Sequence, residues 1–147
     1  MILAKIETNS LVEKRPFWVR MYNPETNEEF VYDIKCDNFD QGTYEYLIDQ
    51  GWTDDCLFNG MWTGEQFRDH WRDKIRLDRI VGWDGRFNAE AFNKLGIKVY
   101  GVSLLDLFLF KFPERKGRFS LRAISKDLNL TGSDWENLIE IYKMVRE

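Results

Sequence analysis

Alternation of apolar and polar residues predicts a small sheet near the N-terminus. The run Phe17–Tyr22, FWVRMY, alternates between two faces and lies between a proline and an Asn-Pro pair, as a half-buried strand does. The run Glu29–Cys36 is its expected partner, because the intervening NPETNE carries proline and asparagine, which favour a hairpin connection. With a further short strand at Leu3–Ile6, we expect an antiparallel sheet of two or three strands.

Two helices are predicted to follow this sheet. Asp40 can cap a short helix that Gly51 ends, since aspartate accepts the free amides of a first turn and glycine tolerates a left-handed C-terminus. Thr63 and Gln66 have the spacing of a capping box, so each side chain can bond the other's backbone N–H. The pattern predicts a helix from Thr63 to about Val81.

The next segment predicts alternating short elements. Asn88 is expected to cap a helix over residues 89–95, and residues 97–100 form a brief strand or extended link. Ser103 begins a further helix, which is apolar on nearly every side through Phe110. A helix of that composition is buried on most of its surface.

The segment 121–140, LRAISKDLNLTGSDWENLIE, resembles the helix-turn-helix superfamily. Such a unit requires a small residue where its helices cross and a residue that tolerates positive φ at the turn. Ser125 and Asn129 occupy these positions, where the family usually has Ala and Gly. The resemblance implies two crossed helices with the following apolar contacts: Ile124, Leu128, Leu130, Trp135 and Leu138.

The expected fold is therefore α+β. Residues 1–101 form an antiparallel sheet with packed helices, and residues 102–147 form a three-helix, helix-turn-helix-like region. The two regions could also make one compact domain, because 147 residues is the size of one ordinary domain. No apolar run approaches the length of a bilayer span.

Composition limits the classes of protein to which this chain can belong. Aromatic residues make up 16% of the chain, which indicates a packed globule with well-filled cores or adhesive surfaces. Two cysteines and a charged N-terminal segment give no disulfide framework and no leader. We therefore expect a cytoplasmic protein.

Charge divides the chain into an acidic and a basic part. Residues 1–60 carry a net charge of -7 and residues 61–147 carry +3. The acidic part could engage a basic protein partner, such as a nucleic-acid-binding protein, with exposed aromatic residues as anchors. The candidate protein-binding residues are Asp37, Asp40, Trp52, Asp54, Asp55 and Trp62.

The basic residues suggest a second type of surface. Six of them cluster around the connection that leads into the helix-turn-helix-like segment, where they could contact phosphates, and two polar residues near the third helix could read bases. The acids Asp134, Glu136 and Glu140 on that helix oppose DNA binding and favour a packing or protein-contact role. The candidate nucleic-acid-binding residues are Lys111, Arg115, Lys116, Arg118, Arg122, Lys126, Thr131 and Asn137.

Catalytic chemistry has one candidate. A single histidine and two distant cysteines exclude the usual zinc spacings. Asp33-Ile34-Lys35 resembles the acid-x-Lys element of metal-dependent nucleases, which needs a second carboxylate to hold Mg²⁺. Glu13 or Asp37 could supply it only if the fold brings them close.

The sequence thus favours a non-catalytic protein without metal or cofactor, which binds a protein or a protein and nucleic-acid assembly. Its size and aromatic content resemble the small accessory and inhibitor proteins that phages encode. The first alternative is a DNA-binding regulator that uses the C-terminal helices. The second is a metal-dependent nuclease.

Overall fold

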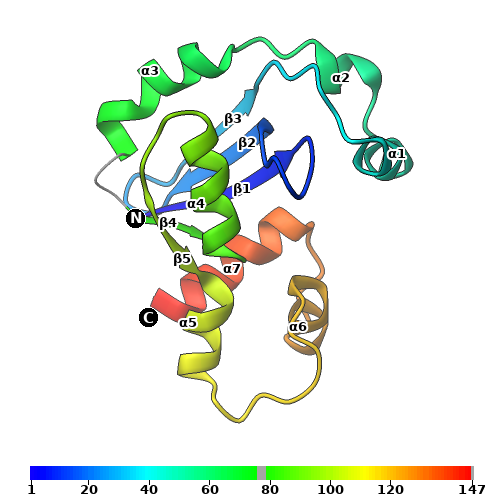
Figure 1. Cartoon of the computed structure of the whole chain (residues 1–147). Coiled ribbons are helices and arrows are strands. Elements are labelled where there is room, and N and C mark those ends of the chain that lie inside the picture. Colours follow the sequence, from blue (N-terminus) through cyan, green and yellow to red (C-terminus); the bar gives the residue numbers. More distant parts are fainter. Residues whose placement is uncertain (76–78, 147) are drawn as a thin grey trace.

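A computed structural model describes residues 1–75 and 79–146, which form a five-stranded mixed sheet and helices on both of its faces (Figure 1). The strands are β1 Ile2–Thr8, β2 Pro16–Asn23, β3 Glu28–Asp33, β4 Arg79–Gly82 and β5 Tyr100–Ser103. The helices are α1 Gln41–Asp49, α2 Asp54–Phe58, α3 Gly64–Ile75, α4 Gly85–Lys94, α5 Leu104–Lys111, α6 Leu121–Asp127 and α7 Asp134–Arg146. The α+β class expected from the sequence is confirmed.

The antiparallel part of the sheet matches the sequence-based prediction. In the order β3-β2-β1-β4-β5, the first three strands pair antiparallel, with Leu3 opposite Tyr22 and Val19 opposite Tyr32. Val19 and Met21 are buried on one face of β2. The alternating pattern of this run therefore predicted correctly which face of the strand is buried.

The parallel part was not predicted. Residues 79–82, assigned to the end of a long helix, form β4, which pairs parallel with both β1 and β5; residues 76–78 lie outside the described part of the chain. Ile80 and Val81 are both fully buried. A short strand buried on both faces has no alternation to distinguish it from a buried helix, and this explains the error.

Helix α4 connects the two parallel strands, and its start also differs from the prediction. Asp84 is the N-cap and accepts a bond from the Phe87 amide at 3.3 Å. Asn88, the expected cap, is buried within the helix and donates from Nδ2 to the Ala4 carbonyl of β1 at 3.2 Å. The asparagine therefore links α4 to the central strand.

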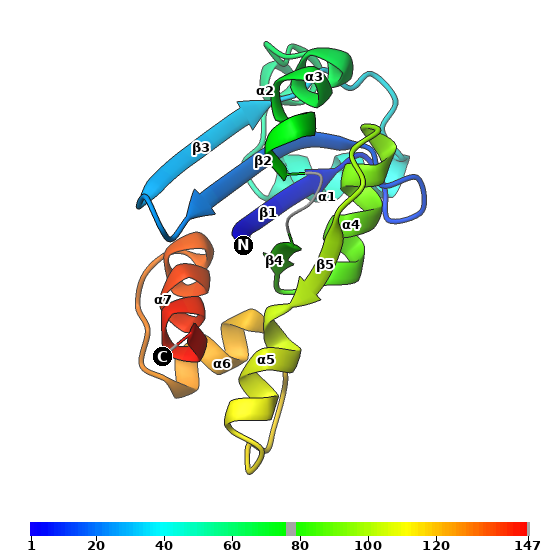
Figure 2. The same cartoon turned by 90° about the vertical axis from the view of Figure 1, so that its left-hand side faces the viewer.

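Two cores cover opposite faces of the sheet. On one face Ala4, Val19 and Met21 pack against α3 and α4 through Phe67 and Phe92. On the other, sheet residues pack with the last three helices in a shared cluster whose buried members are Leu3, Tyr22, Val81, Leu104, Phe108, Ile124, Trp135, Leu138, Ile141 and Tyr142. Figure 2 shows α5, α6 and α7 gathered together, away from α3 and the α1–α2 end.

The C-terminal segment contains the two helices and the turn that its spacing predicts. Asn129 has a φ of 58°, and Ser125 is buried at the start of the turn. Ser133 and Glu136 form the expected capping box, with bonds of 3.2 and 3.3 Å between each side chain and the other's amide. Membership of the helix-turn-helix superfamily stays a prediction.

Close backbone contact between α4 and β5 gives a stability prediction. A Cβ on Gly101 would lie 1.9 Å from the Gly85 carbonyl oxygen, so Gly101→Ala must separate the helix from the strand. We expect it to lower the free energy of unfolding by about 3 kcal/mol or more, as measured by urea titration. Gly42→Ala in α1 is the control, because its Cβ meets only the Asp40 carboxylate at 3.6 Å; equal effects of the two changes would contradict the contact.

Candidate functional site

The charged residue Glu7 lies at the end of the central strand. β1 has a register irregularity between Glu7 and Thr8, and such bulges redirect side chains at strand ends. Because side chains alternate along a strand, Glu7 shares a face with Lys5 and with Leu3, which belongs to the core beneath the C-terminal helices. The carboxyl group is thus directed towards the region where α7 begins.

A second carboxylate influences Glu7. Burial raises the pKa of Glu7 above its ordinary value, the positive charge of Lys5 opposes this shift, and the negative charge of Asp134 adds to it. Asp134 stands in the first turn of α7 and accepts a bond from Arg122 Nη2 at 3.4 Å. β1 and α7, which are far apart in the sequence, therefore bring two carboxylates and a lysine into one electrostatic neighbourhood.

The position of Asp134 depends on how α7 is held against the sheet. Its neighbour Trp135 is buried and donates from Nε1 to Glu29 Oε1 at 2.5 Å. The Arg20 guanidinium lies 5.1 Å from the centre of the Trp135 ring and 3.5 Å from the Glu29 carboxylate. This combination of a cation–π contact and hydrogen bonding fixes the first turn of α7 over β2 and β3.

Glu7 also borders a pocket of about 560 Å³. The buried Asn9 holds one wall, because its Nδ2 donates to the Asn38 carbonyl at 2.6 Å and its Oδ1 accepts from the Arg15 amide at 2.9 Å. Other walls come from the first turns of α1 and α4. The lining residues are Ile6, Glu7, Thr8, Ser10, Leu11, Asp40, Gly42, Thr43, Tyr46, Leu47 and Phe87.

The pocket has the composition of a small-molecule site. It combines apolar and aromatic surface with hydroxyl groups and two carboxylates, Glu7 and Asp40. Its volume lies within the range that ligand pockets occupy. Tyr46 is 59% exposed and Leu11 is 77% exposed, so both could contact a planar group that enters from solvent. Together with Glu7 and Asp134, this pocket forms the candidate site.

The predicted nuclease element lies elsewhere. Asp33 ends the edge strand β3, where its carbonyl accepts from the Trp62 amide at 3.0 Å, and the Lys35 amide donates to the Trp62 carbonyl at 2.7 Å. Glu13 pairs with Arg15 at 3.4 Å. Over residues 1–75 and 79–146, no group of three or more His, Cys, Asp and Glu side chains could hold a metal ion, so the donors expected around Asp33 do not assemble.

Most of the predicted protein-binding residues have structural roles. Asp40 caps α1, Asp54 accepts from the Tyr44 hydroxyl at 2.5 Å, and Asp55 accepts from Asn59 at 2.8 Å. Trp52 packs edge-on against Phe17 and Trp18, and Trp62 against Tyr32. Of this set, Asp37 is exposed with no role evident, and Asp40 borders the pocket.

The predicted nucleic-acid-binding residues divide into two groups. Asn137 is buried and Arg115 is nearly so, and both are occupied by internal bonds, so neither can contact a base or phosphate as expected. Lys111 donates to the Met144 carbonyl at 2.6 Å. The remaining members are exposed: Lys116, Arg118, Arg122, Lys126 and Thr131.

Comparison with solved structures identifies the fold. No family model and no curated protein sequence matches this chain. The structure is similar to E. coli exonuclease I in complex with a dT13 oligonucleotide, with a TM-score of 0.74, 16% identity and 99% of this chain covered. The product-bound and apo exonuclease I structures give TM-scores of 0.75 and 0.76 at the same identity. The chain spans 40% of the length of the oligonucleotide-bound protein.

This likeness corrects the function expected from the sequence. The expectation of a non-catalytic binding protein of inhibitor type is wrong, because the described chain has the fold of a nuclease over nearly its whole length. The similarity is to exonuclease I and to neither an inhibitor nor a helix-turn-helix protein. Of the sequence-based alternatives, the nuclease is the one that the fold supports, with a candidate site other than Asp33. No helix in the described ranges is long and apolar enough to cross a membrane.

The charge pattern of β1 is the feature of the sequence that points to this site. The strand predicted at Leu3–Ile6 continues to Thr8, and within it Lys5 and Glu7 alternate with buried residues at positions 4 and 6. A charged pair on one face of a central strand is unusual. Its significance depends on the parallel strands, which make β1 central and which the sequence pattern did not reveal.

The raised pKa of Glu7 predicts a pH-dependent effect of Glu7→Gln. Below pH 4.5 the carboxyl is protonated in both folded and unfolded chains, whereas at higher pH the folded chain must bury a charge that the unfolded chain hydrates. Wild-type stability relative to the variant should therefore fall as pH rises above 4.5. Thermal unfolding at pH 4 to 8 should show the variant melting higher near neutrality; a difference that does not change with pH would contradict this assignment. Glu28→Gln, on an exposed side chain of β3, controls for the loss of one carboxylate.

Proposed function

We propose that this chain is a nuclease-type unit that acts on single-stranded nucleic acid. The observation that carries the proposal is its similarity to exonuclease I over 99% of its length, including a structure with a bound oligonucleotide. The candidate site supports it, because a carboxylate borders a pocket of suitable size for one nucleotide.

A single strand suits this pocket better than a duplex does. A base can enter a pocket only when it is outside a helical stack, and removing it from a duplex requires unstacking and unpairing. A terminal nucleotide of a single strand meets no such barrier. Tyr46 and Phe87 provide aromatic surface in the pocket, and aromatic side chains bind successive bases with little sequence preference.

The carboxylates determine how a metal ion could be held. Hydrolytic nucleases use divalent cations to polarise the phosphate and to lower the pKa of a bound water. Glu7 and Asp134 are two donors, which is few for a protein cage, but Mg²⁺ is commonly bound by one or two carboxylates with waters and substrate phosphates. Glu7 and Asp134 would be the residues to contact an ion that enters with the nucleic acid, which would supply most of the remaining ligands.

Lys5 and Arg122 define the charge of the site in the absence of a ligand. Burial raises the pKa of Glu7 and the charge of Lys5 partly opposes that rise, while Arg122 bonds Asp134. Each carboxylate therefore has a neighbouring cation. A phosphate approaching these residues would meet cations as well as acids, which reduces like-charge repulsion.

Hydrolysis is the direct test. End-labelled oligo(dT) incubated with the protein and Mg²⁺ or Mn²⁺ should be shortened, and Glu7→Gln should lower the rate at least about tenfold, because changes around a metal site usually reduce affinity or activity by about 10- to 100-fold. Glu28→Gln should leave the rate unchanged. Intact oligonucleotide with both cations would contradict nuclease activity.

Binding tests the pocket independently of hydrolysis. Without divalent cations, Tyr46→Ala should weaken binding of fluorescent oligo(dT) by about tenfold, since stacking of a base on an aromatic ring contributes about 1–3 kcal/mol. Tyr100→Ala is the matched control, because Tyr100 is also exposed, on β5 outside the pocket. Equal losses in the two variants would show that the pocket does not receive the base.

A further inference from the structure

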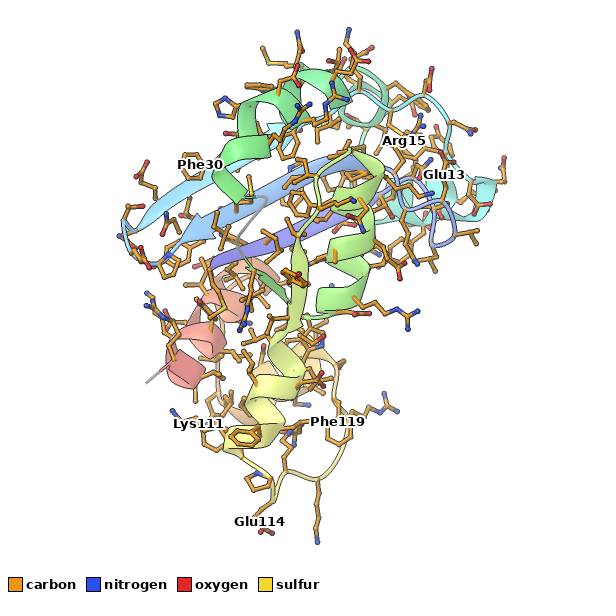
Figure 3. The ribbon with its side chains drawn as sticks, turned by 60° about the vertical axis from the view of Figure 1, so that its left-hand side comes forward. Glu13, Arg15, Phe30, Lys111, Glu114 and Phe119 are labelled. Atoms are coloured by element: carbon orange, nitrogen blue, oxygen red, sulfur yellow. The ribbon has the colours of Figure 1, made fainter. Side chains whose placement is uncertain are left out.

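The connection between α5 and α6 and the following helix form an exposed surface, of which the candidate site uses Arg122 alone. Residues 110–126 contain six basic residues and one acid, a net charge of +5, within a protein whose formal net charge is -4. Figure 3 shows Lys111, Glu114 and Phe119 at the end of the molecule that lies far from Glu13 and Arg15. The positive charge is therefore concentrated locally.

Arg115 organises this connection from within. Its guanidinium donates to the carbonyls of Lys116 and Arg118 at 2.6 and 2.8 Å and pairs with Asp127 at 2.6 Å, and the side chain is only 12% exposed. By binding both carbonyls, Arg115 fixes the backbone of the two residues whose cationic side chains are exposed. The surface is thus presented by an internally bonded segment.

The exposed cations follow a regular spacing. Arg118, Arg122 and Lys126 occur at intervals of four residues, and the last two lie on one face of α6. Phe119 stands beside the first of them and is 45% exposed. We call Lys116, Arg118, Phe119, Arg122 and Lys126 the basic track. It alternates cations with an exposed aromatic ring, the combination that binds the phosphates and bases of a single strand.

Part of the basic track borders a hollow beside α7. Arg122 and Lys126 line a hollow of about 440 Å³ between α6 and α7, together with Thr131 and Asp134. Arg122 bonds Asp134, whose charge in turn acts on Glu7. The track and the hollow therefore share Arg122 and Lys126, and Asp134 relates the hollow electrostatically to Glu7.

We propose that the basic track holds the phosphate backbone of a single-stranded nucleic acid whose end occupies the pocket beside Glu7. This inference rests on the proposed function and adds a second, independent contact region to it. Nucleic acid is favoured over an acidic protein because the cations are regularly spaced beside an exposed ring, the combination that single strands bind.

The test compares long and short oligonucleotides by fluorescence anisotropy without divalent cations. The double variant Arg118→Ala with Lys126→Ala should bind oligo(dT) of about twenty nucleotides at least about tenfold more weakly. The slope of log affinity against log salt should become shallower by about 1.4, because each phosphate contact on a single strand contributes about 0.7. Binding of a trinucleotide, which is too short to reach from the pocket to the track, should not change.

Control variants separate the possible failures. Lys94→Ala with Lys98→Ala removes the same charge from other exposed positions and should leave both affinities nearly unchanged. Phe119→Ala should weaken binding of the long oligonucleotide at least about fivefold. The track proposal is wrong if wild-type protein binds both lengths and the track variant binds the long oligonucleotide equally well. It is also wrong if poly-glutamate at equal charge concentration displaces the long oligonucleotide. If wild-type protein binds neither length, the proposed function fails instead.

Discussion

The central strand β1 is covered on both faces, and this constraint organises the rest of the structure. Its even-numbered residues 4 and 6 face the core formed with α3 and α4, while Leu3 faces the core formed with the C-terminal helices. A strand in this position offers few places for charge. Lys5 lies in the middle of β1 and Glu7 near its end, where Glu7 borders the pocket. The most constrained strand therefore also carries the candidate site.

The contacts that hold α7 against the sheet also set the charge environment of Glu7. Trp135 joins α7 to the sheet through Glu29 and Arg20, and the adjacent Asp134 is thereby set close enough to raise the pKa of Glu7. Burial of a carboxylate near a like charge is unfavourable for folding. Such an arrangement is typical of residues that act on a ligand, because their environment is adapted to a charge distribution that the free protein lacks.

Two buried asparagines hold the elements around this junction without adding charge. Asn88 bonds the Ala4 carbonyl, and Asn137 bonds both the amide and the carbonyl of Gly132 at 3.1 Å. Amide side chains satisfy buried backbone groups without the desolvation penalty of a carboxylate. Asn88 connects α4 to β1, and Asn137 connects α7 to the turn that precedes it. Glu7 and Asp134 are then the two acids whose interaction defines the site.

The sequence by itself determined the elements whose signals are local. The antiparallel strands, the capping boxes at Thr63 and Ser133 and the positive φ at Asn129 follow from alternation, spacing and turn chemistry over a few residues. Only the tertiary structure decided the parallel pairing of β4 and β5. The buried β4 carries no alternating pattern, and parallel pairing requires contacts distant in the chain. The candidate site belongs to this second category: Glu7 and Asp134 are 127 positions apart in the numbering, and only the placement of α7 against β1 brings them together.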